Sequence, residues 1–185
     1  MRWCSAGDAP PFCTRVIACY GRASSGISIK SAMRQLVIFI ATGAWTGYAP
    51  FAPGTFGSIV GLIVGCLVFA PIWRRSPAAF LMVFVIVFVL ACWIAGSAEK
   101  ILGEHDSSKI VLDEVLGMVA TMFMNPTGWI SLAAGFALFR IFDIIKPFPA
   151  SLIDRRVRGG AGVMLDDIAA GIYANLVLQA ARRLL

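Results

Sequence analysis

Long stretches without a charged residue constrain this chain more than any other feature. Asp, Glu, Lys and Arg are absent from Gln35–Trp73, Ser76–Ala98, Val115–Phe139 and Ile168–Ala181. A helix that crosses a membrane needs about 20 mainly apolar residues. Only 14% of the 185 residues are charged, against about 25% in an average soluble domain. The sequence therefore predicts a polytopic membrane protein and excludes a soluble domain or a disordered chain.

The fold class follows from the continuity of the apolar stretches. They do not alternate as the strands of an outer-membrane barrel do, so we expect an all-α fold, a small membrane helical bundle. About four to five spanning helices are expected, over Phe56–Trp73, Phe80–Ala98, Lys109–Met124, Trp129–Lys146 and Asp166–Ala181.

A segment rich in proline and glycine precedes the first of these helices. Because Pro50 and Pro53 fall within Gly47–Ser58, this segment cannot be one continuous helix. Non-helical backbone at membrane depth persists only where protein or a watery cavity satisfies it. We therefore predict a re-entrant or interfacial loop, with Thr55 or Ser58 capping the helix that follows.

The charges divide the chain and orient it. Residues 1–33 are expected to be a poorly ordered, basic cytoplasmic tail, and residues 34–185 a membrane-embedded catalytic domain. If the helices alternate in direction, all ten acids lie on one face, and only Arg74, Arg75, Arg182 and Arg183 lie opposite. The positive-inside bias makes the face with the acids cytoplasmic. The net charge of +6 indicates attraction to anionic lipid, with no nucleic acid as a partner.

Acidic residues gather at three helix ends on that face. They are Asp113, Glu114, Asp143, Asp166 and Asp167. Each charge within a spanning segment costs about 2.5–3.5 kcal/mol on the insertion scale, so a set of five predicts a function. A divalent cation would remove their mutual repulsion, and oxygen ligands favour Mg²⁺, Mn²⁺ or Ca²⁺. A phosphate could bridge such a metal to the nearby Arg140 and Lys146.

Several kinds of phosphatase are excluded by the composition. His105 is the only histidine, so a histidine nucleophile cannot be joined by a histidine acid. No Cys is followed six positions later by Arg, and no Asp-x-Asp pair occurs. If the protein acts on phosphate, we expect it to use a metal-activated water.

Four blocks of sequence resemble the phosphatidylglycerophosphatase A family. They are Pro50–Ser58, Ile110–Gly117, Phe139–Pro147 and Gly159–Gly171, and the resemblance covers roughly residues 49–171. It implies a Mg²⁺-dependent lipid phosphatase of the bacterial inner membrane. Its reaction would be hydrolysis of phosphatidylglycerophosphate to phosphatidylglycerol and inorganic phosphate, the last step of phosphatidylglycerol synthesis.

The resemblance also implies roles for single residues. The five acids above correspond to the family's acids and are the predicted catalytic residues and metal ligands. Arg140 and Lys146 correspond to its cations, and Asp106 to a recurring acid. We add Thr55, Ser58 and Arg158 as predicted substrate-binding residues, because hydroxyl groups and a glycine-rich stretch beside an arginine suit a phosphate.

Two other functions stay open on the sequence alone. A CDP-alcohol phosphatidyltransferase also uses intramembrane Asp residues with Mg²⁺, but its Asp-Gly signature is missing from Asp143–Asp167. A small cation channel or transporter would need polar residues at several depths, whereas Ile59–Ala70 and Phe80–Leu90 are nearly featureless. The number of metal ions, the general base and the oligomeric state are not fixed by the sequence.

Overall fold

The structure, a computed structural model, describes residues 29–104, 107–148 and 160–184. The chain divides into two compact units, Met1–Met33 and Arg34–Leu185. Most of the predicted tail lies outside the described residues. Its last residues, from Ile29, begin helix α2 (Ile29–Ala41). All contacts reported below lie within the second unit.

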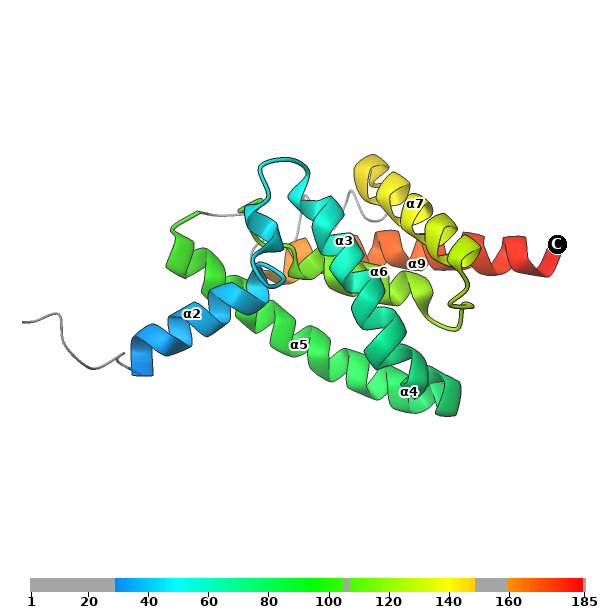
Figure 1. Cartoon of the computed structure of the whole chain (residues 1–185), viewed down its shortest axis with the longest axis horizontal. Helices are drawn as coiled ribbons and strands as arrows, with labels where there is room; N and C mark the ends of the chain where they lie inside the picture. Colours follow the sequence, from blue (N-terminus) through cyan, green and yellow to red (C-terminus); the bar gives the residue numbers. More distant parts are fainter. Residues whose placement is uncertain (1–28, 105–106, 149–159, 185) are drawn as a thin grey trace, which may run out of the picture. The chain divides into compact units, whose positions relative to one another are not determined.

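Every regular element among the described residues is helical (Figure 1). This confirms the all-helical fold class. After α2 and the short 3₁₀ turn η1 (Thr46–Tyr48), the elements are α3 (Pro53–Val64), the π-helical turn η2 (Gly65–Phe69), α4 (Ala70–Arg75), α5 (Pro77–Leu102), α6 (Leu112–Met122), α7 (Trp129–Ile145) and α9 (Gly160–Leu184).

Two helical segments are long and apolar enough to cross a membrane. They are Pro53–Arg75, which joins α3, η2 and α4, and Pro77–Leu102, which is α5. Much of their apolar surface faces outward: Val85 and Val89 of α5 are 58% and 59% exposed. Exposed apolar surface of this extent is unfavourable in water and suits a lipid environment. These two helices are compatible with a membrane protein.

Helices α6 and α9 pack against each other more extensively than any other pair, and Figure 1 shows them side by side. Glycines make this possible. A Cβ atom on Gly117 would lie 2.6 Å from the ring of Phe139 and 2.8 Å from the carbonyl oxygen of Asp167. A Cβ atom on Gly171 would meet the carbonyl oxygen of Gly117. Small residues that let backbones approach this closely are typical of helix contacts in membranes.

The direction of the helices gathers their charged residues at two ends. The start of α6, the end of α7 and the start of α9 meet at one end, which carries the acids. At the other end, the Arg74 guanidinium donates to Thr127 Oγ1 at 2.6 Å, and Arg182 donates to the Met124 carbonyl at 3.3 Å. Arg74 and Arg182 therefore lie away from the acids, as the alternation of helices predicts.

An aromatic cluster fills the core near the arginine end. Phe69 and Trp73 are 5% and 4% exposed, and their rings lie 5.7 and 5.6 Å from the ring of Phe80. Phe80 stacks on Phe123 at 4.4 Å and on Phe84 at 5.5 Å. The turn η2 precedes Trp73 and sets the direction from which α4 presents it to this cluster.

Two local predictions were wrong. Neither Thr55 nor Ser58 caps α3: the helix begins at Pro53, after Ala52 in the left-handed conformation (φ 47°), and no side chain bonds to its first turn. Proline is well suited to the first helical position because its missing N–H would be unpaired there anyway. The last helix was expected to begin at Asp166, but α9 already begins at Gly160.

The close contact of α6 and α9 predicts a large stability effect at Gly171. In Gly171→Ala the new methyl group would force the two backbones apart, at a cost of about 1–3 kcal/mol, as in other overpacked cores. The measurement is the unfolding temperature of the purified protein in detergent, which should fall.

Gly96→Ala is the matched control, because Gly96 lies inside α5 with no atom within 4 Å of an added Cβ. This change should leave stability equal or raise it, since alanine favours a helix over glycine by up to about 1 kcal/mol. Equal unfolding temperatures for the two variants would contradict the close contact.

Candidate functional site

Three carboxylates converge where α6 and α9 begin. Asp113 and Glu114 lie in the first turn of α6, and Asp167 lies on α9. One oxygen of each lies within 4.8 Å of the corresponding oxygens of the other two. Asp113 and Asp167 are only 7% and 5% exposed. The first turn of α6 and helix α9 therefore bring three carboxylates close together. They are called here the carboxylate cluster (Asp113, Glu114 and Asp167).

Local hydrogen bonds hold the loop before α6, which lies outside the carboxylate cluster. The Ser107 hydroxyl donates to Glu104 at 2.7 Å, and the Lys109 ammonium donates to the same carboxylate at 3.1 Å. These two hydrogen bonds lower the pKa of Glu104. The Val111 N–H then donates to the Ala41 carbonyl at 3.0 Å, which ties the start of α6 to the end of α2.

Burial leaves the cluster short of positive charge and of hydrogen-bond donors. Asp113 accepts one hydrogen bond at 3.1 Å, from the backbone N–H of Glu114. Glu114 Oε2 is buried and accepts none. Among the residues that the structure describes, no Lys or Arg forms an ion pair with these three acids. Buried carboxylates this close repel one another. Either one of them takes up a proton, or a bound cation offsets their charge.

The donor set fits a divalent cation. Hard cations such as Mg²⁺ and Ca²⁺ take carboxylate oxygens, and Mg²⁺ is commonly held by one or two of them together with water and substrate phosphate. The unpaired Glu114 Oε2 is the kind of buried atom that such an ion would satisfy. Asp113, Glu114 and Asp167 are the residues that could hold it.

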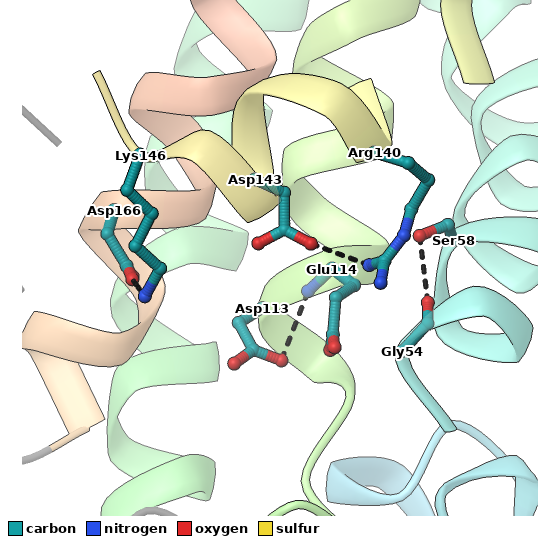
Figure 2. Close-up of polar contacts among 8 residues, drawn as sticks. All are labelled: Gly54, Ser58, Asp113, Glu114, Arg140, Asp143, Lys146 and Asp166. Atoms are coloured by element: carbon teal, nitrogen blue, oxygen red, sulfur yellow. Dashed lines mark hydrogen bonds and ion pairs between the residues drawn. The ribbon is translucent and has the colours of Figure 1, made fainter. Parts of the chain in front are cut away.

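The other two predicted metal ligands are paired with cations instead. Asp143 accepts from Arg140 at 2.6 Å within α7, and Asp166 accepts from Lys146 at 2.5 Å, which links the end of α7 to α9. Figure 2 shows both pairs beside Asp113 and Glu114. Asp143 also acts electrostatically on Asp167 and Glu114, so these ion pairs border the carboxylate cluster.

The start of α3 forms another side of the site. A Cβ atom on Gly54 would collide with Glu114 Oε1 and would lie 3.1 Å from Arg140 Nη1. Gly54 therefore allows Glu114 and Arg140 to reach the first turn of α3, where the positive end of the helix dipole favours an anion. Sequence reasoning missed this role, because nothing in the motif distinguishes a glycine needed for space from one needed for a turn.

The predicted substrate-binding residues are not equivalent in the structure. Thr55 is half-buried in the first turn of α3. Ser58 is fully buried, and its hydroxyl already donates to the Gly54 carbonyl at 2.8 Å, as Figure 2 shows. Ser58 thus supports the backbone at Gly54. Arg158, together with His105 and Asp106, lies outside the described residues.

Buried carboxylates beside paired cations, on a helical scaffold with two membrane-compatible segments, are typical of enzymes that act on phosphate at a membrane. Comparison with known proteins identifies the family. The model of the phosphatidylglycerophosphatase A family matches residues 39–182. The chain belongs to this family and is a phosphatase.

Three relatives are similar over most of their length. Phosphatidylglycerophosphatase A of Haemophilus influenzae is 35% identical over 82% of this chain and 91% of its own. Its namesake in Escherichia coli K12 is 36% identical over 75% and 79%. A Bacteroides thetaiotaomicron protein named "Putative phosphatidylinositol-3-phosphatase" is 36% identical over 80% and 94%. No solved structure matches the chain.

The space at Gly54 predicts that Gly54→Ala loses activity without unfolding. The methyl group would displace Glu114 and Arg140, and misplacement of such groups by about 1 Å commonly costs about a hundredfold in rate. The measurement is the release of inorganic phosphate by the purified variant, with its unfolding temperature measured in parallel.

Gly128→Ala is the control, because an added Cβ at Gly128 meets nothing within 4 Å. It should keep the activity of the unmodified protein. Full activity in Gly54→Ala would show that Glu114 and Arg140 do not need this space.

Proposed function

We propose that this protein hydrolyses phosphatidylglycerophosphate to phosphatidylglycerol and inorganic phosphate, the last step of phosphatidylglycerol synthesis, and that the reaction depends on Mg²⁺. The observation that carries the proposal is the carboxylate cluster bordered by the Arg140–Asp143 and Lys146–Asp166 pairs. Family membership and the names of two relatives support this choice of substrate.

The cluster of Asp113, Glu114 and Asp167 would hold the Mg²⁺. A bound Mg²⁺ supplies two things: it offsets negative charge on the phosphate, and it makes water a better nucleophile near neutral pH. The protein's part is to fix three carboxylates at one point and to keep most water away from them, which burial of Asp113 and Asp167 achieves.

Arg140 and Lys146 would bind the phosphate. Both side chains are partly buried, and both form an ion pair with a carboxylate. The ion pairs fix the orientation of the two side chains before the substrate binds. Guanidinium and ammonium groups offset the charge that builds on phosphoryl oxygens during transfer. The hydroxyl of Thr55, in the first turn of α3, would add a hydrogen bond.

One carboxylate would orient the attacking water and accept its proton. Asp143 suits this task best, because its side chain is 15% exposed and it borders the cluster without belonging to it, whereas Asp166 is 4% exposed. Water attacks phosphorus, the bond from phosphorus to the glycerol oxygen breaks, and the proton that Asp143 accepted passes to that oxygen, so phosphatidylglycerol leaves as the alcohol. The ion pair with Arg140 would hold Asp143 in position for both transfers.

We further propose a multi-pass arrangement in the bacterial inner membrane, with about four to five crossings, a re-entrant or interfacial loop before α3, and the site facing the cytoplasm. The two long apolar segments and the separation of acids from Arg74 and Arg182 support it. Helix α6 is only about 16 Å long, which is shorter than the hydrocarbon core of a bilayer. A membrane crossing at α6 therefore needs the residues that follow the helix as well. The acyl chains of the substrate can then stay in the bilayer while its phosphate reaches the carboxylates.

Removal of one charge from the cluster, or of the charge of Asp143 beside it, should nearly stop the reaction. We expect Asp113→Asn, Asp167→Asn and Asp143→Asn each to lower phosphate release by about a hundredfold or more, because each removes a charged ligand or the proton acceptor. The assay is phosphate release from phosphatidylglycerophosphate in detergent.

Glu104→Gln makes the same chemical change outside the site and is the matched control. Glu104 is an exposed acid that pairs with Lys109. Its variant should keep near-normal turnover. Near-normal turnover in all three Asp variants would refute the proposed site.

Metal and substrate are tested together with four compounds. Phosphatidylglycerophosphate, phosphatidic acid and phosphatidylinositol 3-phosphate are assayed for phosphate release, and a CDP-linked lipid together with an acceptor alcohol for CMP release, before and after removal of divalent cations. We expect the first lipid to be hydrolysed fastest, chelation to stop the reaction, and Mg²⁺ to restore it. Preference for the inositol lipid, or CMP release, would contradict the proposed substrate.

A further inference from the structure

An apolar groove runs between α5 and α9, beside the site but outside it. Its volume is about 250 Å³, and side chains of α5, the end of α6 and α9 line it. Leu81 and Ile172 form its rim and are 52% and 50% exposed, so the groove is open sideways. The stacked rings of Phe84, Phe80 and Phe123 close its far end.

One end of the groove lies at the α9 residue next to the carboxylate cluster. Ile168 lines it and follows Asp167 in the chain. Neighbouring residues on a helix point about 100° apart, so α9 presents Asp167 to α6 and Ile168 to the groove. From Ile168 to Asn175, the last α9 residue that lines the groove, the helix rises about 10 Å. The groove therefore leads from the cluster toward the aromatic core.

The lining requires no polar ligand. Asn175 is its one polar residue, and the Asn175 amide nitrogen donates to the carbonyls of Thr121 and Phe123 at 2.9 and 2.7 Å. The Asn175 amide oxygen accepts from Gln179 at 2.9 Å. With these atoms engaged, the surface left to face an occupant is mainly carbon. A hydrocarbon chain is the chemistry that such a surface favours.

We propose that this groove holds one acyl chain of the lipid substrate while its phosphate lies at the carboxylate cluster. The inference rests on the proposed function, and it adds a binding site for the tail to the site for the head group. The groove ends next to Asp167, so a lipid whose phosphate lies at the cluster can place an acyl chain in the groove. The open rim lets that chain enter sideways from the bilayer.

A second, larger pocket does not compete for this role. It has a volume of about 500 Å³ and lies near Asn125 and Arg182. Along α9, Arg182 is about 22 Å from Asp167, so a lipid whose tail filled that pocket would hold its phosphate away from the cluster.

The test fills the groove and compares two substrates. Ile172→Trp and Leu81→Trp place a bulky ring at the rim. We expect each to raise KM for long-chain phosphatidylglycerophosphate about tenfold, the effect of excluding roughly two methylenes from an apolar site. Turnover of the deacylated, water-soluble head group should stay unchanged, because it has no tail to bind.

Matched controls carry the same substitution on the same helices outside the groove. Leu176 of α9 and Val85 of α5 are each 58% exposed and do not line it. Leu176→Trp and Val85→Trp should leave both substrates unaffected. Equal effects of rim and control variants, or equal losses on both substrates, would overturn the groove as a tail site.

A measurement without turnover separates this inference from the proposed function. A phosphatidic acid with a photoreactive group on one acyl chain is crosslinked to the unmodified protein, and the labelled residues are identified by mass spectrometry. We expect label on Phe84 or Phe123, displaced by excess phosphatidylglycerophosphate. Label that excess lipid does not displace would overturn the inference even if hydrolysis is normal. Displacement without hydrolysis would support the groove and refute the proposed reaction.

Discussion

The close approach of α6 and α9 is the constraint on which the rest of this molecule depends. It is possible because Gly117 and Gly171 have no side chains where the two backbones meet. This contact brings Asp167 of one helix within reach of Asp113 and Glu114 of the other. A wider spacing would leave each acid alone at a helix end, where it could be solvated. The small residues therefore control the chemistry of the site as well as the packing.

The five acids at this end of the bundle differ in whether they have a cationic partner. Two of them, Asp143 and Asp166, are balanced by Arg140 and Lys146, and the other three share one small space. The ion pairs hold the two cations in fixed directions at the border of the cluster. The three remaining acids have no ion pair of their own among the described residues, and their closeness favours binding of a cation. Under the proposed function, the first arrangement would position a phosphate and the second a metal ion.

The sequence alone predicts much of this arrangement. Charge-free stretches predicted the helices, and the acids at helix ends predicted that acidic residues gather at one end of the bundle, because both depend only on position along the chain. The division into a cluster and two ion pairs was not predictable, since it depends on how α6, α7 and α9 are rotated against one another. Gly54 was missed for the same reason: its neighbours Glu114 and Arg140 are distant in sequence. The cap of α3 was misassigned because Pro53 begins the helix without one.

The π-helical turn η2 decides which way the end of this helical segment faces. A π turn contains one residue more than an α turn, so it shifts the angular position of everything after it by about 100° relative to a regular α-helix through the same residues. As a regular α-helix, these residues would turn Trp73 away from the Phe80 ring. Arg74 would turn away from Thr127 in the same movement. The segment is apolar and carries no chemistry, yet its one wide turn places a ring in the aromatic core and an arginine at the end of the bundle.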